Sequence, residues 1–161
     1  MTVEEYNRCV EDHSDGLYRF ILKNIRDSEK AEDIVQDSFE KLWRKVKDIN
    51  YSKSKSYLFT TAYHTMIDVI RKDRRIEDFS KEKAESTSHD NQYSDLQEIL
   101  HNALGKLPRV QRTVILLRDY EGYSYAEIGE ITGLSESQVK VYIYRGRIFL
   151  KQYIGSLKAV I

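Results

Sequence analysis

The stretch from Tyr123 to Leu150, YSYAEIGEITGLSESQVKVYIYRGRIFL, constrains the fold more than any other part of the chain. It predicts two helices joined by a tight turn. Ser124 and Glu127 have the spacing of a capping box, which marks the start of the first helix. Gly133 is expected to end that helix in the left-handed conformation, which costs glycine little. Ser135 begins the second helix with the same capping pattern.

The second predicted helix has an apolar seam and a polar, basic outer face. Residues at helical spacing form the seam: Val139, Tyr142, Ile143, Gly146 and Leu150. The outer face and its flanks contain Ser137, Lys140, Val141, Tyr144, Arg145 and Arg147. A helix of this kind after a short turn is typical of the DNA-reading helix-turn-helix. The alternative is an ordinary helical hairpin with a solvated charged face.

Composition predicts an all-α protein with a segregated charge. The 161 residues include one proline and seven glycines, and apolar residues mostly follow helical spacing. The formal net charge is zero, which predicts weak non-specific DNA binding by the isolated chain. From Leu134 onward, however, Glu136 is the one acidic residue against five basic ones. Because local patches set the field that phosphates feel, the second half can still bind nucleic acid.

Helical patterns also fill the first half of the chain. Thr2 is expected to cap a first helix, which Ser14-Asp15-Gly16 could interrupt. The next helix, AEDIVQDSFEKLWRKVKDI, has one apolar stripe and one charged face. Trp43 lies beside the stripe, not within it. An amphipathic aromatic side chain in this position is typical of a partner-protein anchor, although partial burial in a small core is the alternative.

The segment KSYLFTTAYHTMIDVIRKDRR combines aromatic residues with a basic cluster of Arg71, Lys72, Arg74 and Arg75. Rings can stack on exposed bases while basic side chains hold the backbone, so the pattern is compatible with binding single-stranded nucleic acid. The competing interpretation is that tyrosines at helical spacing belong to the core. The residues that follow, 80–94, are polar and are expected to form a flexible linker. We therefore expect domains at 1–79 and 95–161.

Several kinds of site are not expected. Cys9 is the only cysteine, so no intramolecular disulfide can form. The four histidines lack metal-ligand spacing, and no phosphate loop or catalytic motif is found. We expect no metal, no cofactor and no enzymatic activity. Because the sequence lacks a secretory signal and a run of about 18 apolar residues, we also expect a cytoplasmic protein without a membrane span.

Taken together, these motifs resemble those of the extracytoplasmic-function (ECF, group IV) sigma factors of bacterial RNA polymerase, from about Tyr6 to Tyr153 apart from the linker. AEDIVQDSFEKLW is similar to the family's second conserved region. SYLFTTAYHTMIDVIRKDRR is similar to its minus-ten recognition and melting segment. LPRVQRTVILLRDYEGYSYAEIGEITGLSESQVKVYIYRGRIFL is similar to its fourth region, which binds the minus-thirty-five element. The implied fold is a region 2 helical bundle and a region 4 helix-turn-helix domain.

The resemblance also implies partners and site residues. Core RNA polymerase would be bound through the clamp helices of its largest subunit and through its flap region, and an anti-sigma factor is a further expected partner. Polymerase-facing residues would be Asp33, Gln36, Asp37 and Trp43. Residues in or beside the major groove of the minus-thirty-five element would be Ser137, Lys140, Val141, Tyr144, Arg145 and Arg147. Near the melted minus-ten region would lie His64, Arg71, Arg74 and Arg75.

Two positions depart from the family pattern. Tyr57 replaces a usual Trp, with little expected consequence because that aromatic is mainly structural. His64 replaces a common Asn in the pocket for a flipped base of the non-template strand. We therefore expect a minus-ten preference that differs from that of Asn-bearing relatives.

The rival hypothesis is a dimeric helix-turn-helix regulator with an N-terminal interaction domain and a palindromic site. It leaves AEDIVQDSFEKLW and the basic aromatic segment without a role. A helical interaction protein, such as an anti-sigma factor, is a third hypothesis, but it would not need an outward Arg145.

Overall fold

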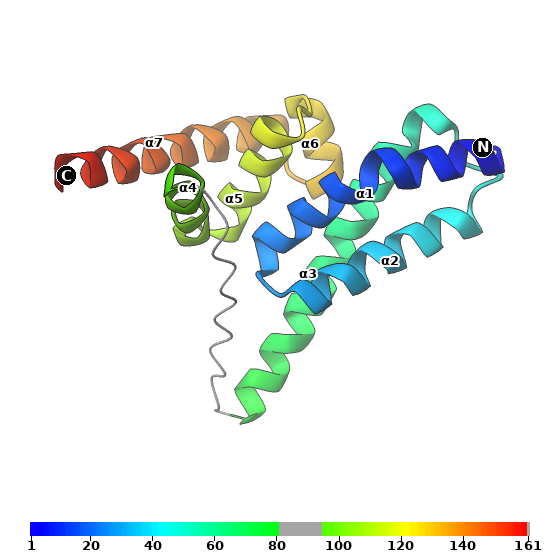
Figure 1. The fold of residues 1–161 in the computed structure, drawn as a ribbon, viewed down its shortest axis with the longest axis horizontal. Coiled ribbons are helices and arrows are strands. Elements are labelled where there is room, and N and C mark those ends of the chain that lie inside the picture. The colour runs from blue at the N-terminus through cyan, green and yellow to red at the C-terminus, as the bar shows by residue number, and fades with distance from the viewer. Residues whose placement is uncertain (81–94, 161) are drawn as a thin grey trace. The chain divides into compact units, whose positions relative to one another are not determined.

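The computed structural model describes residues 1–80 and 95–160, with side chains described for 1–77 and 95–156 (Figure 1). The chain divides into two compact units, Met1–Ser88 and His89–Ile161. Every secondary-structure element in the described ranges is helical, which confirms the predicted all-α class. The predicted linker at 80–94 lies outside the described residues, apart from Ser80, which ends a helix.

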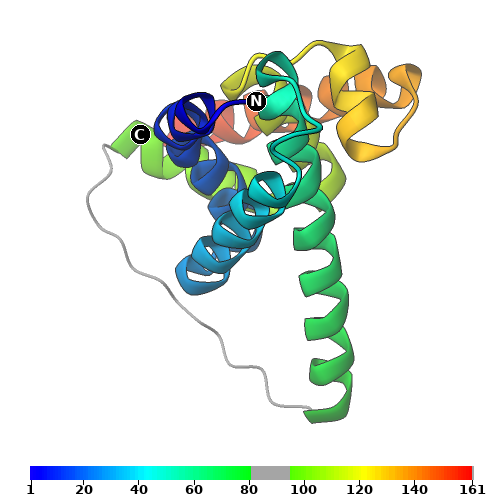
Figure 2. The same ribbon diagram turned by 90° about the vertical axis from the view of Figure 1, so that its right-hand side faces the viewer.

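The first unit is a three-helix bundle with one short 3₁₀ turn. It contains α1 (Val3–Ile25), α2 (Ser28–Arg44), η1 (Tyr51–Lys53) and α3 (Ser54–Ser80). Each of the three long helices packs on the other two. The last turns of α3 extend past α1 and α2 (Figure 2). This extension carries the basic cluster of the sequence away from the core of the bundle.

Local chemistry explains where these helices begin and end. Thr2 caps α1 and Glu5 completes the capping box, as the sequence predicts. Arg26 ends α1 in the left-handed conformation, with φ +56°, and Asp27 caps α2 by accepting from the Lys30 N–H at 3.1 Å. The possible interruption at Ser14-Asp15-Gly16 is absent, because α1 continues through it. Burial on α2 and α3 evidently outweighs the low helix propensity of these three residues.

The core of this unit comes from the apolar faces of all three helices. Phe20 of α1 and Phe59 of α3 have ring centroids 5.5 Å apart and are almost fully buried. Around this pair lie other buried side chains: Leu17, Ile21, Ala31, Ile34, Leu42, Leu58 and Met66. Buried Cys9 donates a hydrogen bond from its thiol to Ser54 Oγ at 3.0 Å, so it has a structural role. The bundle therefore leaves the polar faces of α2 and α3 exposed.

The second unit carries the predicted helix-turn-helix. It contains α4 (Asp95–Lys106), α5 (Arg109–Ile115), the π-helical turn η2 (Leu116–Tyr120), α6 (Tyr125–Thr132) and α7 (Glu136–Val160). α7 packs against α4, α5 and α6. Its core includes Leu104, Val114, Leu117, Ile128, Ile131, Val139 and Ile143. The apolar seam expected on the second helix of the motif is thus largely confirmed, because Val139, Ile143 and Gly146 are buried.

Two glycines allow close packing in this unit. A Cβ on Gly129 of α6 would lie 2.8 Å from the backbone carbonyl oxygen of Leu134, just beyond the turn. A Cβ on Gly146 of α7 would overlap Cδ1 of Ile115 on α5. Gly133 ends α6 at φ +80°, as predicted. These contacts fix the angle at which α7 leaves the turn.

Candidate nucleic-acid and polymerase interfaces

The outer face of α7 is open and combines polar, basic and aromatic side chains. Tyr144 is 68% exposed and Val141 is 44% exposed. Ser137, Lys140 and Arg145 are also exposed on the first turns of the helix. The second capping box, between Ser135 and Gln138, starts this helix as predicted. A protruding aromatic ring beside basic groups is suited to the edges and phosphates of a DNA groove.

One flank of this face leans on α6. Lys140 lies over the Tyr125 ring at 5.7 Å from its centroid and forms a 3.8 Å ion pair with Glu136. Arg118 lies over the same ring at 4.6 Å and donates to the Tyr123 carbonyl at 2.9 Å. Two cations, Arg118 of η2 and Lys140 of α7, therefore lie over the Tyr125 ring of α6. Their cation–π attraction to the ring holds these three elements together on this flank.

Arg147 lies on the same flank, is exposed, and forms an ion pair with Asp119 of η2. Its Nε donates to Oδ2 of Asp119 at 3.2 Å and its Nη2 donates to Oδ1. The pKa of Arg147 is raised, mainly because its charged form donates to Asp119. All six residues predicted for the minus-thirty-five element are exposed, and Arg147 differs from the other five in its two-point pair with a carboxylate.

The predicted nucleic-acid segment lies on α3, and part of it is exposed. His64 is exposed, and its ring centroid lies 5.8 Å from that of Tyr63. Arg71 and Arg75 are exposed at spacings of seven and eleven from His64, so the three share one face of the helix. Arg74 is exposed beside them. The core side of α3 is formed by Leu58, Phe59 and Met66, whereas Tyr57 and Tyr63 are half-buried. Helix α3 thus has one buried side and one basic side, and the binding of single-stranded nucleic acid stays a prediction.

The outer face of α2 carries the predicted polymerase residues. Asp33 and Gln36 are exposed, and the half-exposed Asp37 pairs with Lys41 at 3.1 Å. Trp43 is 47% exposed and packs edge-on against the Tyr6 ring, with centroids 4.9 Å apart. Trp43 is therefore partly buried, with one side of the ring packed and the other open, and its role as a partner anchor stays a prediction.

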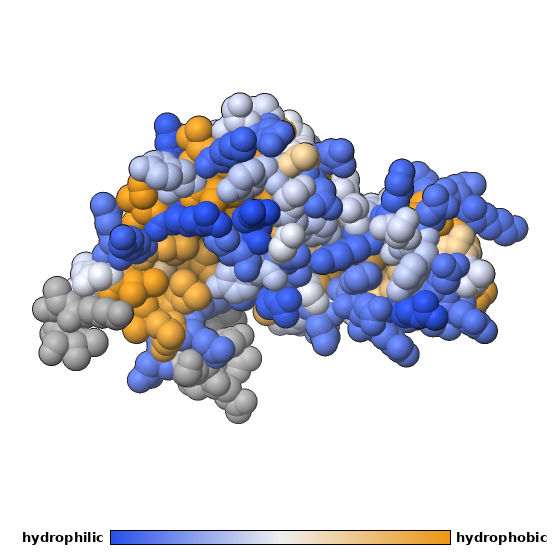
Figure 3. All heavy atoms as spheres, turned by 90° about the horizontal axis from the view of Figure 1, so that it is seen from above, coloured by the Kyte–Doolittle hydropathy of each residue, from blue (hydrophilic) through white to orange (hydrophobic). Residues whose placement is uncertain are grey.

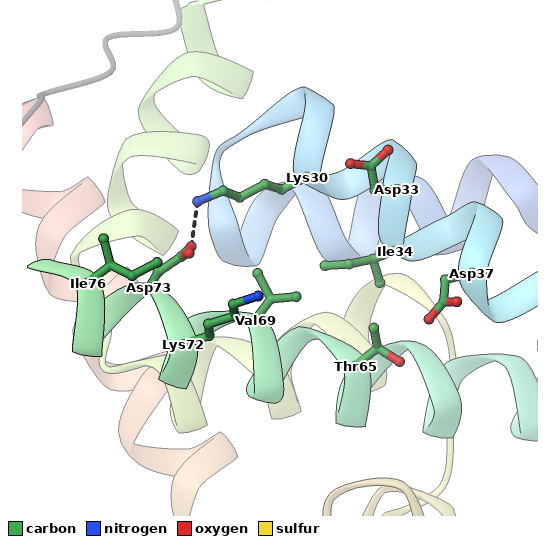
Figure 4. Close-up of a pocket in the computed structure, with 9 residues that line it drawn as sticks. All are labelled: Lys30, Asp33, Ile34, Asp37, Thr65, Val69, Lys72, Asp73 and Ile76. Carbon is green, nitrogen blue, oxygen red and sulfur yellow. Dashed lines mark hydrogen bonds and ion pairs between the residues drawn. The ribbon is translucent and has the colours of Figure 1, made fainter.

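Two grooves flank this face of α2. Lys30, Ile34, Val69, Lys72, Asp73 and Ile76 contribute to a groove of about 580 Å³ between α2 and α3, with Asp33 and Asp37 at its rim (Figure 4). An ion pair between Lys30 and Asp73 crosses it, and Asp37 points toward Thr65 of α3. A second groove, of about 340 Å³, lies between α1 and α2 and is lined by Gln36, Tyr6 and Phe39 among others. Both offer apolar surface beside charges, which suits a protein partner.

An apolar surface is also exposed on the second unit, over α4 and the C-terminal part of α7 (Figure 3). Leu96 is 63% exposed. Half-buried neighbours are Ile99, Leu100, Leu150 and Ile154. Contiguous exposed apolar side chains commonly mark a site for a protein partner.

In the described part of the chain, no cluster of three metal-ligating side chains occurs. None of the described helices is long and apolar enough to cross a membrane.

Comparison with protein-family models finds the Sigma-70 region 2 model at residues 9–76 and the Sigma-70 region 4 model at residues 97–150. The sequence is 34% identical over 140 residues to RNA polymerase sigma factor SigV of Bacillus subtilis, covering 85% of this chain and 83% of that protein. The chain belongs to the extracytoplasmic-function sigma factors of bacterial RNA polymerase. The sigma factor thus binds core RNA polymerase, directs it to specific promoters and initiates transcription.

Further relatives agree. The ECF sigma factor SigM of Bacillus subtilis is 28% identical over 159 residues, with 94% of each chain covered. The solved structure of the sigma factor RpoE bound to the anti-sigma factor NepR, from Bartonella quintana, matches with a TM-score of 0.82. That match has 29% identity and covers 95% of this sigma factor and 98% of RpoE. The predicted family and its two-domain helical fold are confirmed.

Sequence reasoning missed the contacts that position these faces. Asp119 and Arg147 are 28 residues apart, and Lys30 and Asp73 are 43 apart. Lys41 of α2 also donates to Oγ1 of Thr65 on α3 at 3.3 Å. Thr65 is the residue that follows His64 in the sequence. No local spacing links such pairs, so a single sequence contained no signal for them.

Proposed function

We propose that this sigma factor reads its promoter with two separate surfaces, one on each unit. The open face of α7 would bind the minus-thirty-five element through Ser137, Lys140, Val141, Tyr144 and Arg145. The exposed side of α3 would hold the minus-ten strand, with His64 at a flipped base and Arg71, Arg74 and Arg75 on phosphates. The observation that carries the proposal is the exposure of Tyr144 and Val141 on a capped helix after a glycine turn.

The polymerase would bind the other exposed surfaces. Asp33, Gln36, Asp37 and Trp43 would meet the clamp helices, since α2 presents them together between two apolar grooves. The flap region would bind the apolar surface over α4 and α7. Residues 1–79 would then act in clamp binding and minus-ten melting, residues 95–161 in minus-thirty-five binding, and residues 80–94 as the connection between them.

An anti-sigma factor is the remaining proposed partner. RpoE, which matches this chain over nearly its whole length, was solved with the anti-sigma factor NepR. We infer that a comparable inhibitor covers polymerase-binding surfaces of this sigma factor. It would act in the cytoplasm, as a specificity subunit without a catalytic site of its own.

A promoter library tests the assignment of the two surfaces. Core polymerase and the sigma factor would transcribe templates with randomised minus-thirty-five and minus-ten elements, and the enriched sequences would be read. Arg145→Ala is expected to relax one minus-thirty-five position, at a cost of about 1–3 kcal/mol if Arg145 reads a base. His64→Asn is expected to change the minus-ten preference alone. Equal loss on all minus-thirty-five sequences would instead identify Arg145 as a phosphate contact.

The proposal fails if each substitution alters the wrong element, or if His64→Asn leaves the minus-ten preference unchanged. Lys151→Ala, an exposed basic residue further along α7, is the matched control. It should leave both preferred elements as in the wild type.

A further inference from the structure

A two-point ion pair joins the recognition helix to the turn that precedes the helix-turn-helix. Arg147 of α7 donates from Nε to Oδ2 of Asp119 at 3.2 Å, and from Nη2 to Oδ1 at 2.5 Å. One guanidinium therefore engages both carboxylate oxygens. This fork geometry makes Arg–carboxylate pairs stronger and more directional than single contacts.

The π-helical turn η2 places Asp119 opposite α7. In this turn the Glu121 N–H donates to the Leu116 carbonyl at 3.1 Å, five residues back. Turns of this kind are rare and are frequent at functional sites. Asp119 lies within this turn, and its carboxylate meets the Arg147 guanidinium from there.

The pair is accessible to DNA. The side chains of Arg147 and Asp119 are 48% and 37% exposed. A DNA phosphate offers the same pair of charged oxygens as a carboxylate, so it competes for the same guanidinium fork. While the fork is closed, the positive charge of Arg147 is largely compensated by Asp119.

We propose that Asp119 masks Arg147 in the sigma factor and thereby limits binding to DNA of arbitrary sequence. Asp119 then limits the non-specific affinity of the protein without itself touching DNA. This inference rests on the proposed role of α7 in minus-thirty-five binding. It adds that one basic residue beside the reading face is withheld from phosphates by an intramolecular competitor.

The physical consequence is a lower non-specific affinity. Each phosphate neutralised by a basic side chain contributes about 0.9 to the slope of log affinity against log salt. Opening the fork would add one such contact for any sequence. At about 0.1 M salt the slope corresponds to a roughly five- to tenfold gain in affinity. The contacts that Tyr144 and Arg145 make with bases would be unchanged, so the gain would be independent of sequence and would raise the occupancy of random DNA.

Asp119→Asn breaks the fork with little change in size. The amide of the introduced Asn has only one acceptor oxygen for the Arg147 guanidinium. Its NH₂ group is a donor, so it cannot accept the second hydrogen bond. We would measure binding of the full chain to a labelled random-sequence duplex by fluorescence anisotropy over a salt series. Retention on a column of the same immobilised duplex ranks variants whose binding is weak. Thermal unfolding of each variant checks that the second unit is folded.

A double-mutant cycle separates unmasking from the simple loss of a negative charge. Asp119→Asn is expected to bind random DNA five- to tenfold more tightly, with a salt slope steeper by about 0.9. The same substitution in an Arg147→Gln background should produce no such gain. Glu130→Gln removes another exposed carboxylate, on α6, and should have a smaller effect than Asp119→Asn.

The inference is overturned if Asp119→Asn binds and elutes like the wild type, or if its gain is the same with and without Arg147. It is also overturned if Glu130→Gln matches it. These outcomes are distinct from failure of the proposed function. In that case the wild type would not initiate transcription with core polymerase, whatever its affinity for random DNA.

Discussion

Gly129→Ala should distort the turn that delivers α7 to DNA. A Cβ at this position would lie 2.8 Å from the Leu134 carbonyl oxygen, about 0.6 Å inside ordinary van der Waals contact. The opposing atom belongs to the backbone of a tight turn, where Gly133 has φ +80° and donates to the Gly129 carbonyl at 2.8 Å. It cannot move aside as the end of a flexible side chain could.

The magnitude follows from two opposed effects. Forcing an extra carbon into a packed site costs about 1–3 kcal/mol. Replacing a helical glycine by alanine returns about 1 kcal/mol. Gly155→Ala in α7 has the second effect without the first, since a Cβ added at Gly155 would meet no atom outside the local helix within 4 Å. The difference between the two substitutions should therefore be about 1–3 kcal/mol in the unfolding free energy.

The two units provide an internal control for this measurement. Trp43 is the only tryptophan and belongs to the first unit, so its fluorescence follows the unfolding of that unit. Far-UV circular dichroism follows both units. Gly129→Ala should lower the dichroism transition of the second unit and leave the Trp43 transition in place. It should also weaken minus-thirty-five recognition, because α7 leaves the turn at a different angle.

This expectation is refuted if Gly129→Ala stabilises the protein as much as Gly155→Ala does. An equal shift of the Trp43 transition would also contradict it, because the clash is confined to the second unit.

Three further predictions concern other contacts. Trp43→Ala should weaken core-polymerase binding by about 2 kcal/mol or more, if the half-open ring is an interface anchor, which a titration of core polymerase measures. Ser124→Ala removes the capping box of α6 and should cost about 1 kcal/mol in chemical unfolding, whereas Ser137→Ala on the exposed face should stay within about 0.5. Hydrogen bonding to Asp73 raises the pKa of Lys30 above its ordinary 10.5. The stability from this half-exposed pair, at most about 1 kcal/mol, is therefore complete below pH 10.5 and lost as pH rises through the folded-state pKa. The free energy of unfolding, measured below and above the folded-state pKa of Lys30, should therefore fall less with pH in Lys30→Gln than in the wild type.

The local features of the fold could be predicted from the sequence. Three capping boxes, at Thr2, Ser124 and Ser135, could be predicted because each depends on residues only three positions apart. The end of α6 at Gly133 was readable because a left-handed residue favours glycine. Within the described residues, the amphipathic stripes also predicted most of the core.

Features that depend on distant contacts could not be predicted. The 3₁₀ turn at Tyr51–Lys53 packs against α1 and α3, and no local pattern in the sequence predicts it. The π-helical turn η2 follows α5 without any signal in LLRDY. The candidate site could be predicted as a set of exposed helix faces, because helical spacing determines which residues share a side. The ion pair between Arg147 and Asp119 could not be predicted, because Asp119 lies two elements earlier in the chain.

The central claim is that this sigma factor directs core polymerase to promoters. Purified core polymerase, the full chain and a library of promoter fragments would be combined, and transcript start sites mapped. We expect defined start sites that appear only with the chain present, each preceded by shared minus-ten and minus-thirty-five elements. Sequence-specific DNA binding by a dimer, without any new transcript from core polymerase, would contradict this claim.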